Sequence, residues 1–250
     1  MAPTIEPVPQ GALMRFPTPI DYSSTWALQQ RLHAERLADR CPDTFLLLEH
    51  HPVFTAGRQT LPEHMPGVSP RSLSSAIGLQ RVNRGGSITY HGPGQLVGYP
   101  ILKLNRVASG PKAYVRLLED IVIATVKQWG IEGRRQDGTP GVWIHAADGF
   151  AKIASIGVRV DHGVTLHGFA LNVDLDLAPF SSIVPCGLAD SRTTSMAQLV
   201  RSPIELTAVA EQIVTHSSRL LHVDWIRQPM NVLGDDVPIW TPLALSQEAG

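Results

Sequence analysis

Apolar and polar positions recur with helical spacing in three stretches of the chain. Between residues 21 and 40, apolar side chains return every three to four positions, which predicts a helix. The stretch 112–129 has a wide apolar face and predicts the most strongly amphipathic helix. Ser202-Pro203-Ile204-Glu205 has the pattern of a capping box with proline in the first turn, and it predicts a third helix that runs to about residue 222.

Short apolar runs bounded by turn residues predict the strands. Residues 44–49 and 95–102 form nearly continuous apolar runs, which are typical of buried strands. Three further runs, 141–145, 151–160 and 164–173, follow one another along the chain, and a tight turn joins the last two. Consecutive antiparallel strands mixed with separate helices favour an α+β fold over alternating βαβ units.

The composition narrows the class of protein. The chain has 250 residues, 43% apolar and 17% charged, which suffices for one domain that we place at residues 12–225, with 1–11 and 226–250 as terminal extensions. The net charge of −1 argues against attraction to nucleic acid or to an anionic membrane, and no apolar run is long enough to span a bilayer. Two cysteines and no zinc-ligand spacing favour a cytoplasmic protein without a metal site.

The segment from Arg84 to Tyr99 is the most informative part of the sequence, with five glycines in sixteen residues. Glycine lets a backbone approach a ligand closely, so the segment predicts a rigid binding cradle. It lacks the lysine and the helix start of a phosphate loop, and its β-branched and aromatic residues favour a strand edge along an extended ligand. His91 either bonds or exchanges protons with the ligand, or it orients the loop. Arg84 binds either an anion or an acidic side chain of the protein.

Two residues outside this segment are candidates for chemistry. Cys186 lies between proline and glycine, so it is either an exposed nucleophile or a small buried side chain. Lys152 interrupts an apolar strand, so it either reaches water at an edge or is a buried amine. A buried ammonium would lower the pKa of a nearby thiol, whereas a neutral amine would accept its proton. Cys41 has no such setting, and we interpret it as structural.

These blocks together resemble the lipoyl(octanoyl) transferase family. The cradle matches the family as Arg84-Gly-Gly-x-x-Thr-x-His-x-x-Gly-Gln-x-x-x-Tyr99, preceded by Glu49-His-x-Pro-Val-Phe-Thr-x-Gly57. The later blocks follow in the family's order, as Lys152-Ile-Ala-Ser-Ile-Gly157, His167-Gly-Phe-Ala-Leu-Asn172 and Pro185-Cys-Gly187. The resemblance covers about residues 12–225, and the two terminal extensions have no counterpart in it.

The resemblance implies the fold of biotin and lipoate protein ligases, with a mixed, mostly antiparallel sheet flanked by helices, and a reaction without cofactor or metal. In this family an octanoyl group passes from octanoyl-acyl carrier protein to a lysine of lipoyl domains of 2-oxoacid dehydrogenases or of glycine cleavage H protein. The cysteine matching Cys186 carries the acyl thioester, and the lysine matching Lys152 activates that cysteine. The residues implied to line the acyl site are Arg84, Gly85, Gly86, Ser87, Ile88, Thr89, Tyr90, His91, Ser155, Ile156, Gly157, Gly168, Phe169 and Ala170.

Two other functions remain open on the sequence. An ATP-dependent lipoate or biotin ligase on the same fold would use a similar cradle and lysine, but would not need Cys186 and would need phosphate contacts. A non-catalytic protein that binds acyl or lipoyl groups would need neither residue for chemistry. We expect this protein to be a monomer, to which the family's protein substrates dock.

Overall fold

A computed structural model describes residues 8–67, 77–146, 149–184, 192–200 and 202–228. Its centre is a nine-stranded sheet, and beside it lies a three-stranded sheet. In spatial order, the large sheet consists of β12 (Asp224–Arg227), β1 (Gln10–Arg15), β2 (Thr44–Leu48), β6 (Gln95–Ile101), β10 (Val164–Asn172), β9 (Gly149–Asp161), β8 (Gly141–Ala146) and β7 (Gly133–Arg134), with β11 (Arg192–Thr193) also paired to β9. The small sheet consists of β4 (Gly78–Arg81), β3 (Val53–Ala56) and β5 (Ile88–His91).

Most neighbouring strands of the large sheet are antiparallel, from β2 through β7. The parallel pairs are β12 with β1, β1 with β2, and β11 with β9. In the small sheet β3 pairs parallel with β4 and antiparallel with β5, so β5 is an edge strand. The predicted α+β class with a mixed, mostly antiparallel sheet is confirmed.

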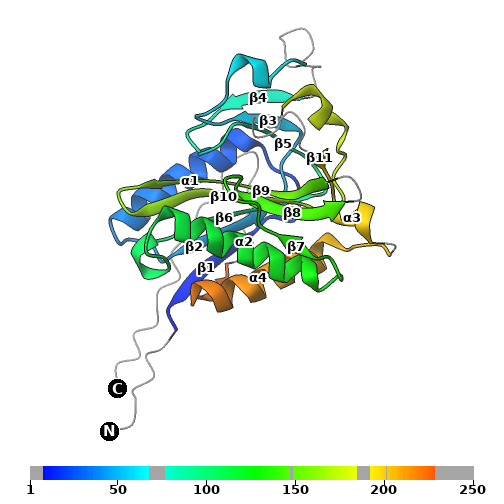
Figure 1. The fold of residues 1–250 in the computed structure, drawn as a ribbon. Helices are drawn as coiled ribbons and strands as arrows, with labels where there is room; N and C mark the ends of the chain where they lie inside the picture. Colours follow the sequence, from blue (N-terminus) through cyan, green and yellow to red (C-terminus); the bar gives the residue numbers. More distant parts are fainter. Residues whose placement is uncertain (1–7, 68–76, 147–148, 185–191, 201, 229–250) are drawn as a thin grey trace, which may run out of the picture.

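The helices cover both faces of the large sheet (Figure 1). On one face lies α1 (Tyr22–Leu37), and on the other lie α2 (Pro111–Lys127) and α4 (Leu206–Leu221), with the short α3 (Met196–Leu199) near the sheet's edge. The small sheet lies on the same side as α1. Three single-turn 3₁₀ helices, Pro62–His64, Leu104–Arg106 and Ala178–Ser182, complete the elements.

Apolar side chains form a separate core on each face. The largest cluster lies between the large sheet and the α2–α4 pair and includes Tyr114, Ile121 and Val209. A second cluster joins α1 to the opposite face through Leu28 and Leu32. A third fills the space beneath the small sheet and contains Phe54, Tyr90 and Phe180. The middle strands of the large sheet are therefore buried from both sides.

The two helices predicted by periodicity alone are confirmed as α1 and α2, and the predicted strands as β2, β6, β8, β9 and β10. The predicted capping box is wrong. Glu205 is the N-cap of α4, without a side-chain bond, and its carbonyl accepts the first helical hydrogen bonds from Ala208 and Val209. Residues 202–205 lie outside the helix, and this extended approach brings Ile204 against the main core. The sheet also includes two residues beyond each end of the predicted 12–225 domain, whose limits stay a prediction.

Candidate active site

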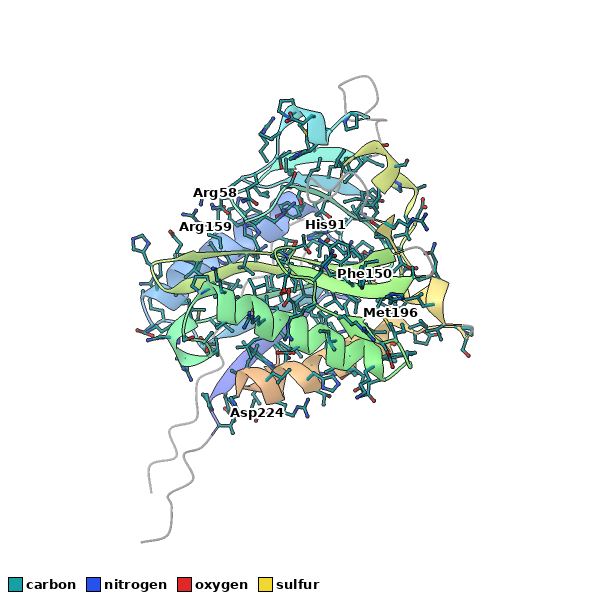
Figure 2. The ribbon with its side chains drawn as sticks, in the orientation of Figure 1. Arg58, His91, Phe150, Arg159, Met196 and Asp224 are labelled. Carbon is teal, nitrogen blue, oxygen red and sulfur yellow. The ribbon has the colours of Figure 1, made fainter. Side chains whose placement is uncertain are left out.

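A small, mainly apolar cavity lies between the small sheet, α1 and the middle of the large sheet. Figure 2 shows the labelled His91 in this region between the two sheets. Twelve of the fourteen predicted acyl-site residues line the cavity, namely Arg84, Gly86, Ser87, Ile88, Thr89, His91, Ser155, Ile156, Gly157, Gly168, Phe169 and Ala170. Four lining residues were not predicted, namely Tyr22, Val97, Tyr99 and His167.

The two remaining predicted residues have other contacts. Gly85 joins the glycine-rich loop to the large sheet, because its N–H donates to the Val158 carbonyl over 3.0 Å. Tyr90 lies in the third hydrophobic cluster, with its ring 5.5 Å from Phe54 and 5.8 Å from Phe180. A strand directs successive side chains to opposite faces, and this places Tyr90 away from Thr89 and His91.

Arg84 fastens the glycine-rich loop. The residue is 8% exposed, and its guanidinium donates to the carbonyls of Ser87 (2.7 Å) and Thr55 (2.6 Å) and to Thr55 Oγ1 (2.8 Å). The loop also lies unusually close to β9. A Cβ on Gly157 would be 2.9 Å from the Gly85 carbonyl oxygen, so only glycine permits this approach. Arg84 thus ties carbonyls of its own loop to β3.

A directed chain of hydrogen bonds leads from Arg84 through the protein. Thr55 Oγ1 accepts from Arg84 and donates to His91 Nε2 (3.2 Å), while His91 Nδ1 donates to Gln95 Oε1 (2.6 Å). The Gln95 amide then donates to Asn172 Oδ1 (2.9 Å). Since the amide oxygen of Gln95 only accepts, His91 Nδ1 carries the proton, and Nε2 of the neutral ring accepts from Thr55; His91 is therefore the neutral Nδ1–H tautomer.

Asn172 continues this chain to the strand beside Lys152. Its amide donates to the Thr194 carbonyl over 2.9 Å, and the Thr194 N–H donates to the Lys152 carbonyl over 2.9 Å. Gln95 donates a second time to the Tyr90 carbonyl (3.1 Å). The wall of the cavity is therefore connected by buried polar side chains to the segment that follows β11.

The histidines around the cavity are uncharged at neutral pH. Burial lowers the pKa of His50 to about 4, and burial together with the nearby charge of Arg84 lowers the pKa of His167 to about 3. Burial also holds the pKa of His91 well below its usual value. His167 has a φ of 59° although it is not glycine, which stores of order 1–3 kcal/mol of strain. The His167 ring stacks on Trp26 with 4.8 Å between ring centroids, and the backbone N–H of His167 donates to Gln29 Oε1. These contacts fix the backbone conformation.

The tyrosines of the cavity are neutral as well. Burial raises the pKa of Tyr22 to about 12 and that of Tyr99 well above its usual value. The Tyr99 hydroxyl oxygen lies 2.8 Å from His50 Nε2, and His50 Nδ1 donates to the Ile20 carbonyl (3.0 Å). Thr89 Oγ1 is buried in the cavity wall and has no hydrogen-bond partner in the described part of the chain. Apart from Arg84, whose guanidinium donates to carbonyls and to Thr55, the titratable side chains of the wall are uncharged, which suits an aliphatic chain with one polar end.

Lys152 is a buried amine rather than an edge residue, with 4% of its surface exposed. Its Nζ donates to the Pro140 carbonyl over 3.2 Å and lies 4.5 Å from the centroid of the Trp143 ring. It precedes Ser155, which lines the cavity, by three positions on β9, or about 10 Å along a strand. Thr193 of β11 pairs with Lys152, and β11 begins six residues after Cys186 in the sequence. Cys186 itself lies outside the described residues.

The remaining structural tests concern metals and membranes. Among the described residues, no group of three or more histidine, cysteine, aspartate or glutamate side chains is arranged to hold a metal ion. No helix in the described ranges is long and apolar enough to cross a membrane.

The fold and the cavity define the class of protein, a catalytic domain of the lipoyl ligase type. Residues 21–218 match the model of the lipoyl protein ligase A/B catalytic domain, and the chain belongs to this family. It is 43% identical over 208 residues to an octanoyltransferase of Thermobifida fusca, covering 82% of this chain and 86% of the relative. It is 48% identical over 182 residues to an octanoyltransferase of Mycobacterium ulcerans, covering 71% and 75%.

Solved structures share the fold at low sequence identity. A bipartite lipoate protein ligase of Thermoplasma acidophilum superposes with a TM-score of 0.71 at 17% identity, over 88% of this chain and 87% of that one. A lipoate-protein ligase A bound with ATP superposes with a TM-score of 0.69 at 17% identity, over 88% of each chain. These structures confirm the predicted ligase-type fold.

Proposed function

We propose that this protein is an octanoyltransferase, which moves an octanoyl group from octanoyl-acyl carrier protein to a lysine of a lipoyl domain. The observation that carries the proposal is the cavity lined by the glycine-rich loop, together with the buried Lys152 three positions before its lining residue Ser155 on β9. The relatives named octanoyltransferase, at 43% and 48% identity over most of both chains, support the same reaction. Lipoyl domains of 2-oxoacid dehydrogenases and glycine cleavage H protein are the proposed acceptors, and we expect a cytoplasmic monomer.

The reaction divides into two acyl transfers through Cys186. The Cys186 thiolate attacks the carbonyl of the octanoyl thioester, a new thioester forms, and the carrier protein's thiol leaves. The acceptor lysine amine then attacks this thioester, an amide forms, and the Cys186 sulfur is released. One thioester replaces another in the first step and an amide replaces a thioester in the second, so neither step needs ATP.

The described residues have distinct roles in this scheme. The octanoyl chain occupies the cavity formed by the glycine-rich loop, Ser155–Gly157 and Gly168–Ala170. In the first step Lys152 takes the proton of the Cys186 thiol and passes it to the departing carrier thiolate; in the second step the neutral amine receives the acceptor's proton and returns it to the Cys186 sulfur. Support for its place beside the thiol comes from β11, which returns the chain to Lys152 at Thr193, seven residues after Cys186.

Intact-protein mass spectrometry tests the proposal. After mixing with octanoyl-acyl carrier protein and no ATP, we expect an octanoyl adduct that hydroxylamine removes, that a lipoyl domain discharges, and that Cys186→Ser abolishes. An adduct that persists in Cys186→Ser would contradict the assignment of the nucleophile. Transfer that occurs only with ATP and free octanoate would indicate a ligase, and binding without any adduct would indicate a non-catalytic protein.

A further inference from the structure

Lys152 has four rotatable side-chain bonds, so a fixed position for its amine requires specific contacts. One of these contacts connects Lys152, through the single peptide group between Pro140 and Gly141, to the side chain of Glu119. The Pro140 carbonyl accepts from Lys152 Nζ at 3.2 Å. The N–H of the same peptide, that of Gly141, donates to Glu119 Oε1 at 3.0 Å. This peptide is trans, so its C=O and N–H point in opposite directions, toward the ammonium and the carboxylate respectively.

Glu119 is held in place for this contact. It lies on α2, which packs against β7, β8 and β9 (Figure 1), and only 5% of its surface is exposed. Its other carboxylate oxygen, Oε2, accepts from Arg135 Nε at 2.9 Å. A buried carboxylate is costly to desolvate. An apolar side chain would fill this part of the interface at less cost, so the contacts with Gly141 and Arg135 are what a carboxylate specifically adds.

Neighbouring residues restrict the position of the Pro140–Gly141 peptide between Lys152 and Glu119. Trp143 Nε1 donates to the Thr139 carbonyl at 3.1 Å, and the Trp143 ring also faces the Lys152 amine. Gly141 has a φ of 137°, and a Cβ there would lie 2.6 Å from the Ala154 carbonyl oxygen and 3.1 Å from Lys152 Cε. Glycine at this position therefore lets the turn approach the lysine closely.

We propose that Glu119 is a positioning residue for Lys152, acting through the Pro140–Gly141 peptide. Hydrogen bonds in a chain strengthen one another, so a carboxylate on the N–H makes the carbonyl a better acceptor for the ammonium. Glu119 thereby restricts the Lys152 amine to one position. This inference rests on the proposed function for its kinetic consequence only, since the contact itself exists in the resting protein.

Glu119→Gln tests the proposal, with Asp120→Asn as the matched control. Asp120 is the next residue of α2 and also pairs with Arg135, but the carboxylate on Gly141 is that of Glu119. Loss of a charge-assisted contact predicts that kcat for octanoyl transfer falls roughly tenfold in Glu119→Gln. In Glu119→Gln, KM for the acyl donor is expected to stay within about twofold of the wild-type value. In Asp120→Asn, the rate of octanoyl transfer is expected to stay within about twofold of wild type.

A second measurement does not depend on catalysis. In wild-type protein, the ¹H–¹⁵N signal of the Lys152 ammonium, assigned with Lys152→Arg, is expected to be protected from solvent exchange. The same signal is expected to persist in Asp120→Asn and to disappear or shift in Glu119→Gln. An unprotected signal in wild type, or equal signals and kcat in the two variants, overturns the proposal. Absence of transfer by wild type would refute the proposed function, while the Lys152 signal would still decide the role of Glu119.

Discussion

Three histidines that are buried in the neutral form make the protein sensitive to mild acid. The pKa is about 4 for His50, about 3 for His167 and well below 6.5 for His91, whereas the unfolded chain has histidine pKa values near 6.5. The unfolded state therefore binds more protons than the folded state below pH 6.5, and stability must fall as the pH falls. The loss begins near pH 6.5 and continues until the folded pKa values are reached.

The size of this loss follows from proton linkage. At pH 5.5, an unfolded histidine with a pKa of about 6.5 is stabilised by about 1.4 kcal/mol through protonation, and the buried histidine gains almost nothing. His50 and His167 together therefore remove about 3 kcal/mol between pH 7.5 and pH 5.5. His91 adds to the loss in the same direction. This is a large share of the usual stability of a domain, about 5–15 kcal/mol.

Urea unfolding at a series of pH values measures this effect. The free energy of unfolding of wild type is expected to fall steeply between pH 7.5 and pH 5.5. In His50→Gln, the difference between the two pH values should shrink by about 1.4 kcal/mol, because one titrating group is gone. His51→Gln is the control, since His51 is the exposed neighbour of His50 and its replacement should leave the difference unchanged. A difference equal in His50→Gln and wild type would refute the argument that His50 is held neutral.

Three further predictions concern the cavity and its wall. In Gly168→Ala, the new Cβ would lie 2.1 Å from the Gly98 carbonyl oxygen, so urea unfolding should show a loss of about 1–3 kcal/mol. Gly78→Ala meets nothing within 4 Å and should change stability by less than about 0.5 kcal/mol. Ala170→Leu should slow formation of the octanoyl adduct roughly 10- to 100-fold relative to a hexanoyl adduct, and an equal loss for both chains would contradict a cavity wall at this position. Asn172→Leu should cost about 2–5 kcal/mol in the same unfolding assay, because two buried groups lose a partner, and a loss below about 1 kcal/mol would contradict the hydrogen-bond chain.

The elements that the sequence predicts are those whose signal is local. Leu28 and Leu32 of α1 are buried at helical spacing, and the long runs of β9 and β10 need only a tight turn at Asp161–Gly163 to pair. Pairings between distant segments have no local signal. The parallel pairing of β1 with β12 joins residues more than 200 positions apart, and neither strand was predicted. The capping box failed because Ile204 contacts the core, a contact that lies outside the local pattern.

The candidate site likewise has parts that the sequence predicts and parts that it does not. The glycine-rich segment was predicted as a binding wall because its composition is unusual over a short stretch. The partners of its charged and polar residues were not predictable, because each lies on another strand. Arg84 bonds to carbonyls of its own loop and of β3, which neither predicted alternative included. Glu119 gave no signal at all, since an acidic residue on an amphipathic helix is ordinary until the fold places Gly141 beside it.

The hydrogen-bond chain also decides between the two roles considered for His91. A general acid or base needs a nitrogen that reaches the substrate and a pKa near the working pH. Both ring nitrogens of His91 are occupied, by Thr55 and by Gln95, and burial holds its pKa well below the usual value. Protonation would end the role of Nε2 as acceptor from Thr55 and add a positive charge near Arg84. His91 therefore orients the cavity wall, and the proton transfers of the proposed reaction fall to Lys152 and Cys186.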